Sequence, residues 1–366
     1  MGSDSHPSSR PSSKTTQHVR PFLADFLGEG PPERPNVSGP SHVTAQGNSK
    51  VFVGVAQTTS TFNAPVENVH NYFYNTQGGR AGHDSNAEAV LGWLSPQDHT
   101  EPYLTALAKF DEGTGQWFLE SSVIQKWFTE GHALLWLHGG GELMPVFLVD
   151  IYPFFDSNGD SVGTGKTTLC AAVVKKGEER CRANLKRRQC FFFFSSQDPN
   201  RRSLEPLQRS LIGQFCTSQS ILEPLRSLYS ECHKTYPARK PSRAELTAVL
   251  AKTLRSLDED VFVFVDALDE IPFAEREEVT SFLAEIAGLK LAHLHLFVTS
   301  RNEPDIEQAL NYPIRWVETT MREEEVNADI DIYVTTFLES STRLRNQEKR
   351  TKDLIRRRLV SQGGSM

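Results

Sequence analysis

From residue 133 onward, apolar residues fall into short continuous runs, separated by longer stretches with apolar positions every three or four residues. Continuous runs of this length are typical of parallel strands that are buried on both faces. The longer periodic stretches suit helices that cross from one parallel strand to the next. The pattern therefore predicts an α/β fold with a parallel central sheet and helices on both of its faces. The predicted strands are 133–140, 190–194, 260–266, 293–299 and about 314–318.

Helical periodicity covers most of the remaining chain after residue 85. A capping box, in which Ser242 and Glu245 satisfy each other's backbone donors, predicts a helix start after Pro237 and Pro241 interrupt the preceding run. The segment 86–131 reads as a helical lead-in to the sheet. The other predicted helical stretches are 167–186, 203–256 with the interruption just described, 274–288 and 323–359.

The first 85 residues have a different composition. Residues 1–45 are rich in Ser, Pro, Gly and Thr, a composition that buries too little apolar surface to offset the entropy of ordering. Residues 46–85 favour short β structure, either as a linker or as a signalling segment. The sequence therefore divides into a disordered region, a β-prone segment, a helical lead-in, an α/β core and a helical extension. Their expected bounds are 1–45, 46–85, 86–131, 132–320 and 321–366.

Composition narrows the class of protein. A content of 38% hydrophobic and 23% charged residues is ordinary for a soluble globular chain. The net charge of −7 argues against a general surface for nucleic acid or for anionic membranes. Five cysteines without a C-x-x-C pair suit a reducing compartment, and the sequence has neither a membrane-span-length apolar run nor a secretory leader pattern. We therefore expect a cytoplasmic protein with no membrane span.

A glycine-rich segment directly precedes the predicted helix 167–186. It contains Gly163, Gly165, Lys166 and Thr167 in the spacing that ends a P-loop. In such a loop, backbone N–H groups surround a phosphate, the lysine reaches the β- and γ-phosphates, and the hydroxyl ligates Mg²⁺. The candidate phosphate-binding residues are Gly139, Gly140, Val162, Gly163, Thr164, Gly165, Lys166, Thr167 and Thr168.

Two later strands end in charged residues that complete such a site. Asp266 closes the strand 260–266 and is a candidate, beside Thr167, to hold Mg²⁺ either directly or through a bound water. Asp269 or Glu270 could orient or deprotonate an attacking water. Arg301, at the end of the next strand, would supply a cation near the transferred charge. The three segments together predict a site for ATP, or alternatively GTP, with Mg²⁺.

The P-loop is interrupted as the chain is written. The first glycine of the motif should stand five positions before Gly165, where the sequence has Asp160. Removal of residues 141–161 would join Gly140 to Val162 and restore a full motif. We interpret 141–161 as an insertion, such as a translated intron. The alternative is that the apolar run 147–152 within it is the true strand.

Several stretches resemble a known family. Residues 92–95, 113–118 and 134–139 resemble the lead-in of fungal NACHT-type proteins, which are signal-transducing NTPases of the STAND class, and are similar to the nephrocystin-3-like N-terminal domain. Residues 265–270 and 299–304 look like that family's Walker B and sensor 1 segments. The resemblance covers roughly 88–365 and implies a nucleotide-dependent switch that hydrolyses slowly and associates with itself or with signalling proteins. The winged-helix region and repeats that usually follow in this family are absent from the sequence.

Two other functional classes compete with this hypothesis. If the segment 141–161 disables the P-loop, the chain is a non-catalytic scaffold or pseudo-NTPase. A metabolic kinase is disfavoured, because nothing resembles a lid for an acceptor substrate and the carboxylates after residue 265 favour hydrolysis over transfer. Scattered histidines give no metal-binding spacing beyond the proposed Mg²⁺ site.

Overall fold

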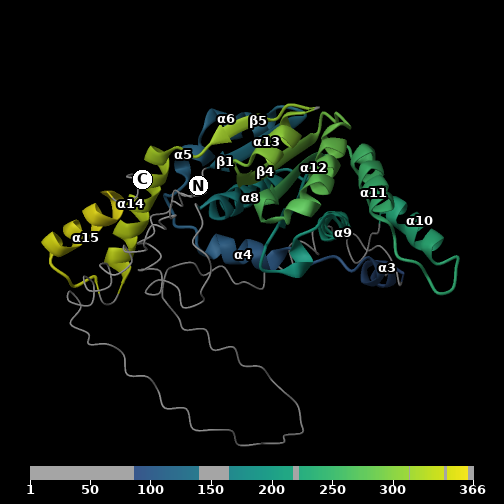
Figure 1. Ribbon diagram of the computed structural model, residues 1–366, viewed down its shortest axis with the longest axis horizontal. Helices are drawn as coiled ribbons and strands as arrows, with labels where there is room; N and C mark the ends of the chain where they lie inside the picture. Colours follow the sequence, from purple (N-terminus) through teal and green to yellow (C-terminus); the bar gives the residue numbers. More distant parts are fainter. Residues whose placement is uncertain (1–85, 140–164, 217–221, 313, 342–343, 362–366) are drawn as a thin grey trace, which may run out of the picture. The chain divides into compact units, whose positions relative to one another are not determined.

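The computed structural model describes residues 86–139, 165–216, 222–312, 314–341 and 344–361 (Figure 1). All of these residues belong to one compact unit. The predicted disordered region, the β-prone segment and the predicted insertion lie outside the described residues.

Five parallel strands form a single sheet in the order β2-β3-β4-β1-β5. The strand β4 therefore lies between β1 and β3, although it follows both in the sequence. This sheet confirms the predicted α/β class with a parallel central sheet. The strands are β1 (Ala133–Gly139), β2 (Arg187–Phe193), β3 (Asp260–Asp266), β4 (Leu294–Arg301) and β5 (Val317–Thr320).

Alternating side chains of each central strand enter two separate cores. In β3, Val261, Val263 and Val265 face one core, whereas Phe262 and Phe264 face the other. Side chains of successive strand residues point to opposite faces, so a strand covered on both faces needs an unbroken apolar run. This is why the continuous runs in the sequence located the strands.

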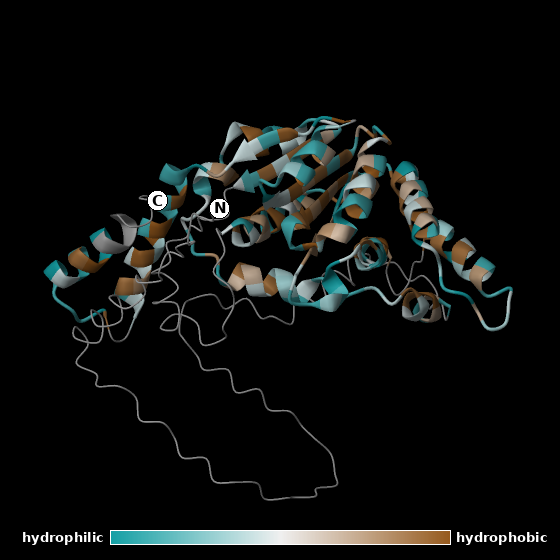
Figure 2. Cartoon of the chain, in the orientation of Figure 1, coloured by the Kyte–Doolittle hydropathy of each residue, from teal (hydrophilic) through white to brown (hydrophobic). Residues whose placement is uncertain are grey.

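Helices cover both faces of the sheet, which makes the fold three-layered (Figure 1). Helices α3, α9, α10, α11, α12 and α13 contribute to the core on the valine side of β3, and α4, α5, α6, α8 and the start of α14 to the other. Apolar residues run along the strands between these helices, whose surfaces mix apolar and polar positions (Figure 2). The helices are α3 (Ala87–Leu94), α4 (Thr100–Ala108), α5 (Gln116–Leu119), α6 (Ser122–Thr129), α8 (Lys166–Ala183), α9 (Leu204–Phe215), α10 (Glu223–Cys232), α11 (Arg243–Ser256), α12 (Phe273–Ala287), α13 (Pro304–Asn311), α14 (Glu323–Ser340) and α15 (Lys349–Ser361).

The lead-in 86–131 and the extension after residue 320 each contain more separate helices than their periodicity predicts. The stretch 86–131 contains four helices, and Gly113 and Gly115, both at positive φ, lie in the turn between α4 and α5. The last strand begins at Val317, three residues later than expected. The predicted capping box of Ser242 and Glu245 is present at the start of α11. No helix among the described residues is both long and apolar enough to span a bilayer.

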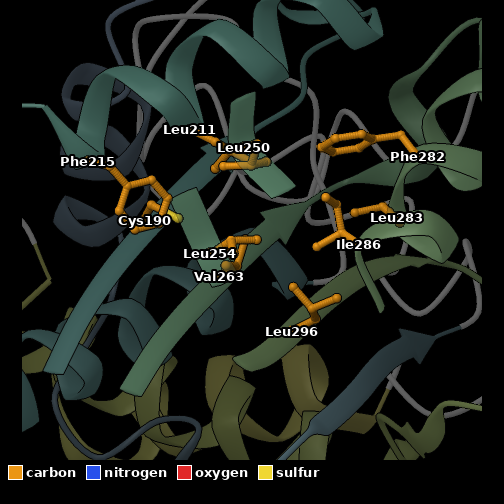
Figure 3. A pocket seen from close by; sticks show the side chains of 10 residues that line it. All are labelled: Cys190, Leu211, Phe215, Leu250, Leu254, Val263, Phe282, Leu283, Ile286 and Leu296. Carbon is orange, nitrogen blue, oxygen red and sulfur yellow. The ribbon is translucent and has the colours of Figure 1, made fainter. Parts of the chain in front are cut away.

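A small apolar cavity lies between the sheet and helices α9, α11 and α12 (Figure 3). Its free space of about 10 Å³ is roughly what one water molecule occupies, and its lining is entirely apolar. It is therefore a packing defect of the core rather than a ligand site. The lining residues are Cys190, Leu211, Phe215, Leu250, Leu254, Val263, Phe282, Leu283, Ile286 and Leu296.

Candidate functional site

The strand order places the ends of β1, β4 and β3 side by side. Gly139, the last residue of β1, is the register partner of Arg301 at the end of β4. On the other side of β4, Val298 pairs with Val265, one residue before Asp266. Because all strands are parallel, these carboxyl ends share one edge of the sheet, which is where ligands of open α/β folds bind.

Helix α8 begins at the same edge. Its N-cap, Gly165, has φ of 79°, a conformation that favours glycine, and α8 contacts β1, β3 and β4. The first helical residue, Lys166, is buried, and burial lowers the pKa of its ammonium group, while Asp269 and then Asp266 act in the opposite direction. The N–H groups of the first turn and a buried cation thus meet at one place, which suits an anion.

Asp266 is held by the neighbouring strand. The hydroxyl of Thr299 donates to Oδ1 of Asp266 at 2.6 Å and accepts from the backbone N–H of Ala267 at 3.0 Å. Ala267 has φ of 62°, so the chain turns sharply away from the sheet directly after Asp266. One buried hydroxyl therefore fixes both the carboxylate and the turn that follows it.

The second carboxylate oxygen of Asp266 is buried against helix α8. Asp266 is 1% exposed, and its Oδ2 has no hydrogen-bond partner among the described residues. Burial raises the pKa of Asp266 to about 6, against the lowering effects of the Thr299 and Thr167 side chains. The thiol of Cys170, also on α8, lies beside this carboxylate, and its pKa is raised by burial and by Asp266. A buried acceptor with spare capacity is costly unless something binds it.

Asp269 and Arg301 form an ion pair at the tips of β3 and β4. Oδ1 of Asp269 accepts from the backbone N–H of Arg301 at 2.9 Å, and Oδ2 lies 3.1 Å from Nε of Arg301. The Arg301 side chain is 57% exposed, whereas that of Asp269 is 10% exposed. Asp269 thus holds the guanidinium at the rim of the site. There, the positive charge of Arg301 is near enough to Lys166 to lower the pKa of its ammonium group.

Glu270 is tied to a different loop. Its Oε2 accepts from the backbone N–H of Ser196 at 2.8 Å, in the segment that follows β2. Leu268, Asp269 and Glu270 form a single 3-10 turn. The two acidic residues that sequence analysis left as alternatives therefore have different neighbours: Asp269 faces β4, and Glu270 faces the loop after β2.

The helix α14 is anchored to the lead-in beside α8. Asp329 accepts from the backbone N–H of Gly115 at 2.8 Å and from Nε1 of Trp117 at 3.0 Å. A Cβ atom at Gly115 would lie 2.7 Å from Cδ1 of Leu169 in the first turn of α8. The turn at Gly115 thus packs directly against the helix that carries Lys166.

The structure brings together Lys166, Thr167, Asp266, Asp269 and Arg301, with Gly139 at the end of the adjacent strand. Thr168 lies in the first turn of α8 and is partly buried. The predicted phosphate-binding residues Gly140, Val162, Gly163 and Thr164 lie outside the described residues.

The acidic segment is held in place by Thr299, Ser196 and Arg276, none of which has a role in the sequence motifs. Thr299 lies two residues before Arg301, on the strand that pairs with the strand of Asp266. Once the strand order is known, this position indicates that its hydroxyl can contact Asp266. Ser196 contributes only a backbone N–H group, and Arg276 stands in a polar helix start, so neither has a sequence signal.

Residues 158–301 match the family described as Nephrocystin 3, N-terminal. The matched range contains α8, β2, β3 and β4, and so every described site residue except Gly139. This match supports a nephrocystin-3-like P-loop NTPase domain. No match was found among curated proteins.

Among solved structures, the chain is similar to a Walker-type ATPase, paby2304, of Pyrococcus abyssi, at 13% identity and a TM-score of 0.36, over 72% of this chain and 66% of that one. It is also similar to the ORC2 protein of Aeropyrum pernix in its ADP form, at 12% identity and a TM-score of 0.37, over 76% of this chain and 63% of that one. The chain spans less than two thirds of the length of either protein.

Proposed function

We propose that this chain is a nucleotide-dependent signalling switch of the NACHT type, which binds ATP, or alternatively GTP, and hydrolyses it slowly. The observation that carries the proposal is the convergence of Lys166, Asp266 and Arg301 beside the N-terminus of α8. These residues come from three separated segments of the chain, and the sheet order places them at one edge.

In the proposed site, Lys166 and the first N–H groups of α8 bind the phosphates. A triphosphate carries several negative charges, and the buried ammonium and helix terminus provide the complementary charge away from bulk water. Arg301 stands at the rim, where its guanidinium can reach the terminal phosphate and stabilise charge that develops there.

The residues present fit a magnesium ion. Oδ2 of Asp266 is a buried acceptor without a partner, and the side chain of Thr167 is close enough to affect the Asp266 carboxylate. Among the described residues no group of three His, Cys, Asp or Glu side chains could hold a metal, and Mg²⁺ bound with phosphates usually needs only one or two protein ligands. Thr167 and Asp266 would hold the ion, which when bound neutralises phosphate charge.

We assign different roles to Asp269 and Glu270. Both oxygens of Asp269 are occupied by Arg301, so Asp269 positions that cation. Among the described residues, the Glu270 carboxylate accepts one hydrogen bond, from the backbone N–H of Ser196. Glu270 is therefore the better candidate to orient or deprotonate water.

The proposed signalling role rests on the lead-in and on α14. The stretches 92–95 and 113–118 resemble the lead-in of NACHT-type proteins, and the turn at Gly115 connects α8 to α14 through Asp329. We propose that nucleotide state is passed through this connection to other copies of the chain or to signalling proteins in the cytoplasm. A non-catalytic scaffold is the second candidate, favoured by Asp160 in place of the first P-loop glycine.

The substitution Lys166→Ala tests nucleotide binding. Loss of a buried charged contact costs about 2–5 kcal/mol, so the Kd for Mg-ATP should rise by about 30-fold or more, measured by calorimetry. The matched control is Lys176→Ala in the same helix, because Nζ of Lys176 donates to the carbonyl of Leu119 at 2.6 Å, away from the site. Equal affinity of the Lys166→Ala variant and the unmodified chain would contradict the proposal, and competition with GTP identifies the preferred base.

A further inference from the structure

The guanidinium of Arg276 connects the acidic segment to the tip of β4. Arg276 lies in the first turn of α12, and its side chain is 12% exposed. Its Nη2 donates to the carbonyl of Asp269 at 2.6 Å, and its Nε donates to the carbonyl of Ile271 at 2.9 Å. One planar group therefore binds the main chain on both sides of Glu270.

The remaining donor of the same guanidinium reaches the segment that follows Arg301. Nη1 of Arg276 forms a short contact with Glu303 and lies 3.2 Å from Oδ2 of Asp305. The backbone N–H of Glu303 donates to the carbonyl of Arg301 at 3.0 Å. Together with the pair of Asp269 and Arg301, these contacts close a ring that joins the two strand tips.

We propose that Arg276 is a positioning residue for hydrolysis, which holds Glu270 and Arg301 in a fixed relation to each other. This inference rests on the proposed function. Every partner of the Arg276 side chain belongs to, or directly adjoins, one of the segments that carry these two residues, and all of its contacts are to main-chain carbonyls or carboxylates. Fixed placement of such groups matters because displacements of about 1 Å can cost about 100-fold in rate.

The geometry also shows which property of Arg276 is needed. Its flat fork of donors serves two carbonyls and two carboxylates at once, which a lysine ammonium cannot do. Charged hydrogen bonds in a mostly buried position are also stronger than exposed ones. A lysine at this position would keep the positive charge opposite Glu303 and Asp305. It would lose the hydrogen bonds to the main-chain carbonyls on both sides of Glu270.

The matched control is Arg209 in α9. Arg209 is 9% exposed, its Nε donates to Glu205 at 2.9 Å, and its Nη1 binds the carbonyl of Leu94. It resembles Arg276 in burial and in joining a helix to a main-chain carbonyl, but it contacts no proposed site residue. A purely structural role would make the substitutions Arg276→Gln and Arg209→Gln equivalent.

The test measures ATP affinity, kcat and thermal unfolding in the full chain. In Arg276→Gln and Arg276→Lys, kcat should fall by about 10- to 100-fold, with the Kd for ATP within about threefold and faster amide hydrogen exchange at residues 268–271. Arg209→Gln should lower the unfolding temperature and leave kcat per folded molecule unchanged. Unchanged kcat in the Arg276 variants, or an equal loss of ATP affinity, would overturn the inference.

A double-mutant cycle separates this inference from the proposed function. In a Glu270→Gln background, Arg276→Gln should lower kcat by a smaller factor than it does in the unmodified chain, because one of the two residues that it positions is already disabled. If Glu270→Gln alone turns over ATP like the unmodified chain, the proposed role of Glu270 fails while Arg276 is intact. If Glu270→Gln abolishes turnover and Arg276→Gln does not reduce it, only the role of Arg276 fails. Glu303→Gln checks the same connection without changing Arg276 and should lower kcat by a smaller factor.

Discussion

At the scale of single residues, the small side chain of Thr299 joins two parts of the candidate site. Its hydroxyl is fully buried, accepts from Ala267 and donates to Asp266. Without that hydroxyl, a buried N–H group and a buried carboxylate oxygen would both lose a partner. The turn that begins at Ala267, with its positive φ, would also lose a fixed point.

The substitution Thr299→Val removes the hydroxyl and keeps the shape of the side chain. We expect a loss of about 1–3 kcal/mol for each buried group left unpaired, and a further rise in the pKa of Asp266, because the Thr299 hydrogen bond lowers it. Thr299→Ser is the control, since it keeps the hydroxyl and deletes one methyl group at a cost of about 1 kcal/mol. Denaturant unfolding measures both, and equal losses in the two variants would contradict the assigned role.

At the scale of elements, two glycines within helices have opposite surroundings. Gly92, in α3, is exposed, and a Cβ atom there would meet nothing within 4 Å. Gly213, in α9, packs against Pro96, and a Cβ atom would lie 2.8 Å from Cβ and 3.0 Å from Cγ of the proline ring. The ring is rigid, so α9 or the segment that carries Pro96 would have to move.

Alanine at these two positions should therefore change stability in opposite directions. Gly92→Ala should stabilise the chain by about 0.5–1 kcal/mol, because glycine is a poor helix former. Gly213→Ala gains the same propensity but overpacks the contact with Pro96, which costs about 1–3 kcal/mol. Thermal unfolding of both variants measures the difference, and stabilisation by Gly213→Ala would show that α9 and Pro96 are not in contact.

Sequence patterns located most elements because burial on two faces leaves a strong signal. Some of these signals depend only on residues that are neighbours in the sequence. Examples are the phenylalanines that predict β2 and β3 and the capping box that predicts the start of α11 at Ser242. Other features depend on residues distant in the sequence. The pairing of Asp269 with Arg301, the Ser196 contact of Glu270 and the Arg276 ring follow from the order of strands, which no local pattern contains.

At the scale of the whole molecule, the position beside β4 belongs to residues 133–139. The sequence contains two candidates for this strand, and the strand that pairs with β4 is the one that ends in Gly139. The second candidate, 147–152, lies outside the described residues, as does the predicted insertion.

Deletion of residues 141–161 tests the predicted insertion. The shortened chain has a complete P-loop motif, so we expect it to bind Mg-ATP more tightly and to be more soluble than the full chain. Calorimetry and sedimentation of both chains measure these properties. If the shortened chain fails to fold or loses ATP binding, the deleted residues include a required strand and the prediction is wrong. Lys166→Ala in the shortened chain is the control that ties any gain in affinity to the P-loop.

The strand order also means that β1 must wait for its neighbours during synthesis on the ribosome, because they are translated after it. The strand β1 is made first, yet its only neighbours in the described sheet are β4 and β5, which are made last. About 150 residues separate β1 from β4, and translation at about 5–20 residues per second makes that interval roughly 8–30 s. During this time Leu134, Leu135, Trp136 and Leu137 have no strand beside them. A nascent chain stalled before β4 therefore leaves the apolar strand β1 unpaired, and changes that weaken β4 should reduce the yield of newly made protein more than the stability of the finished one.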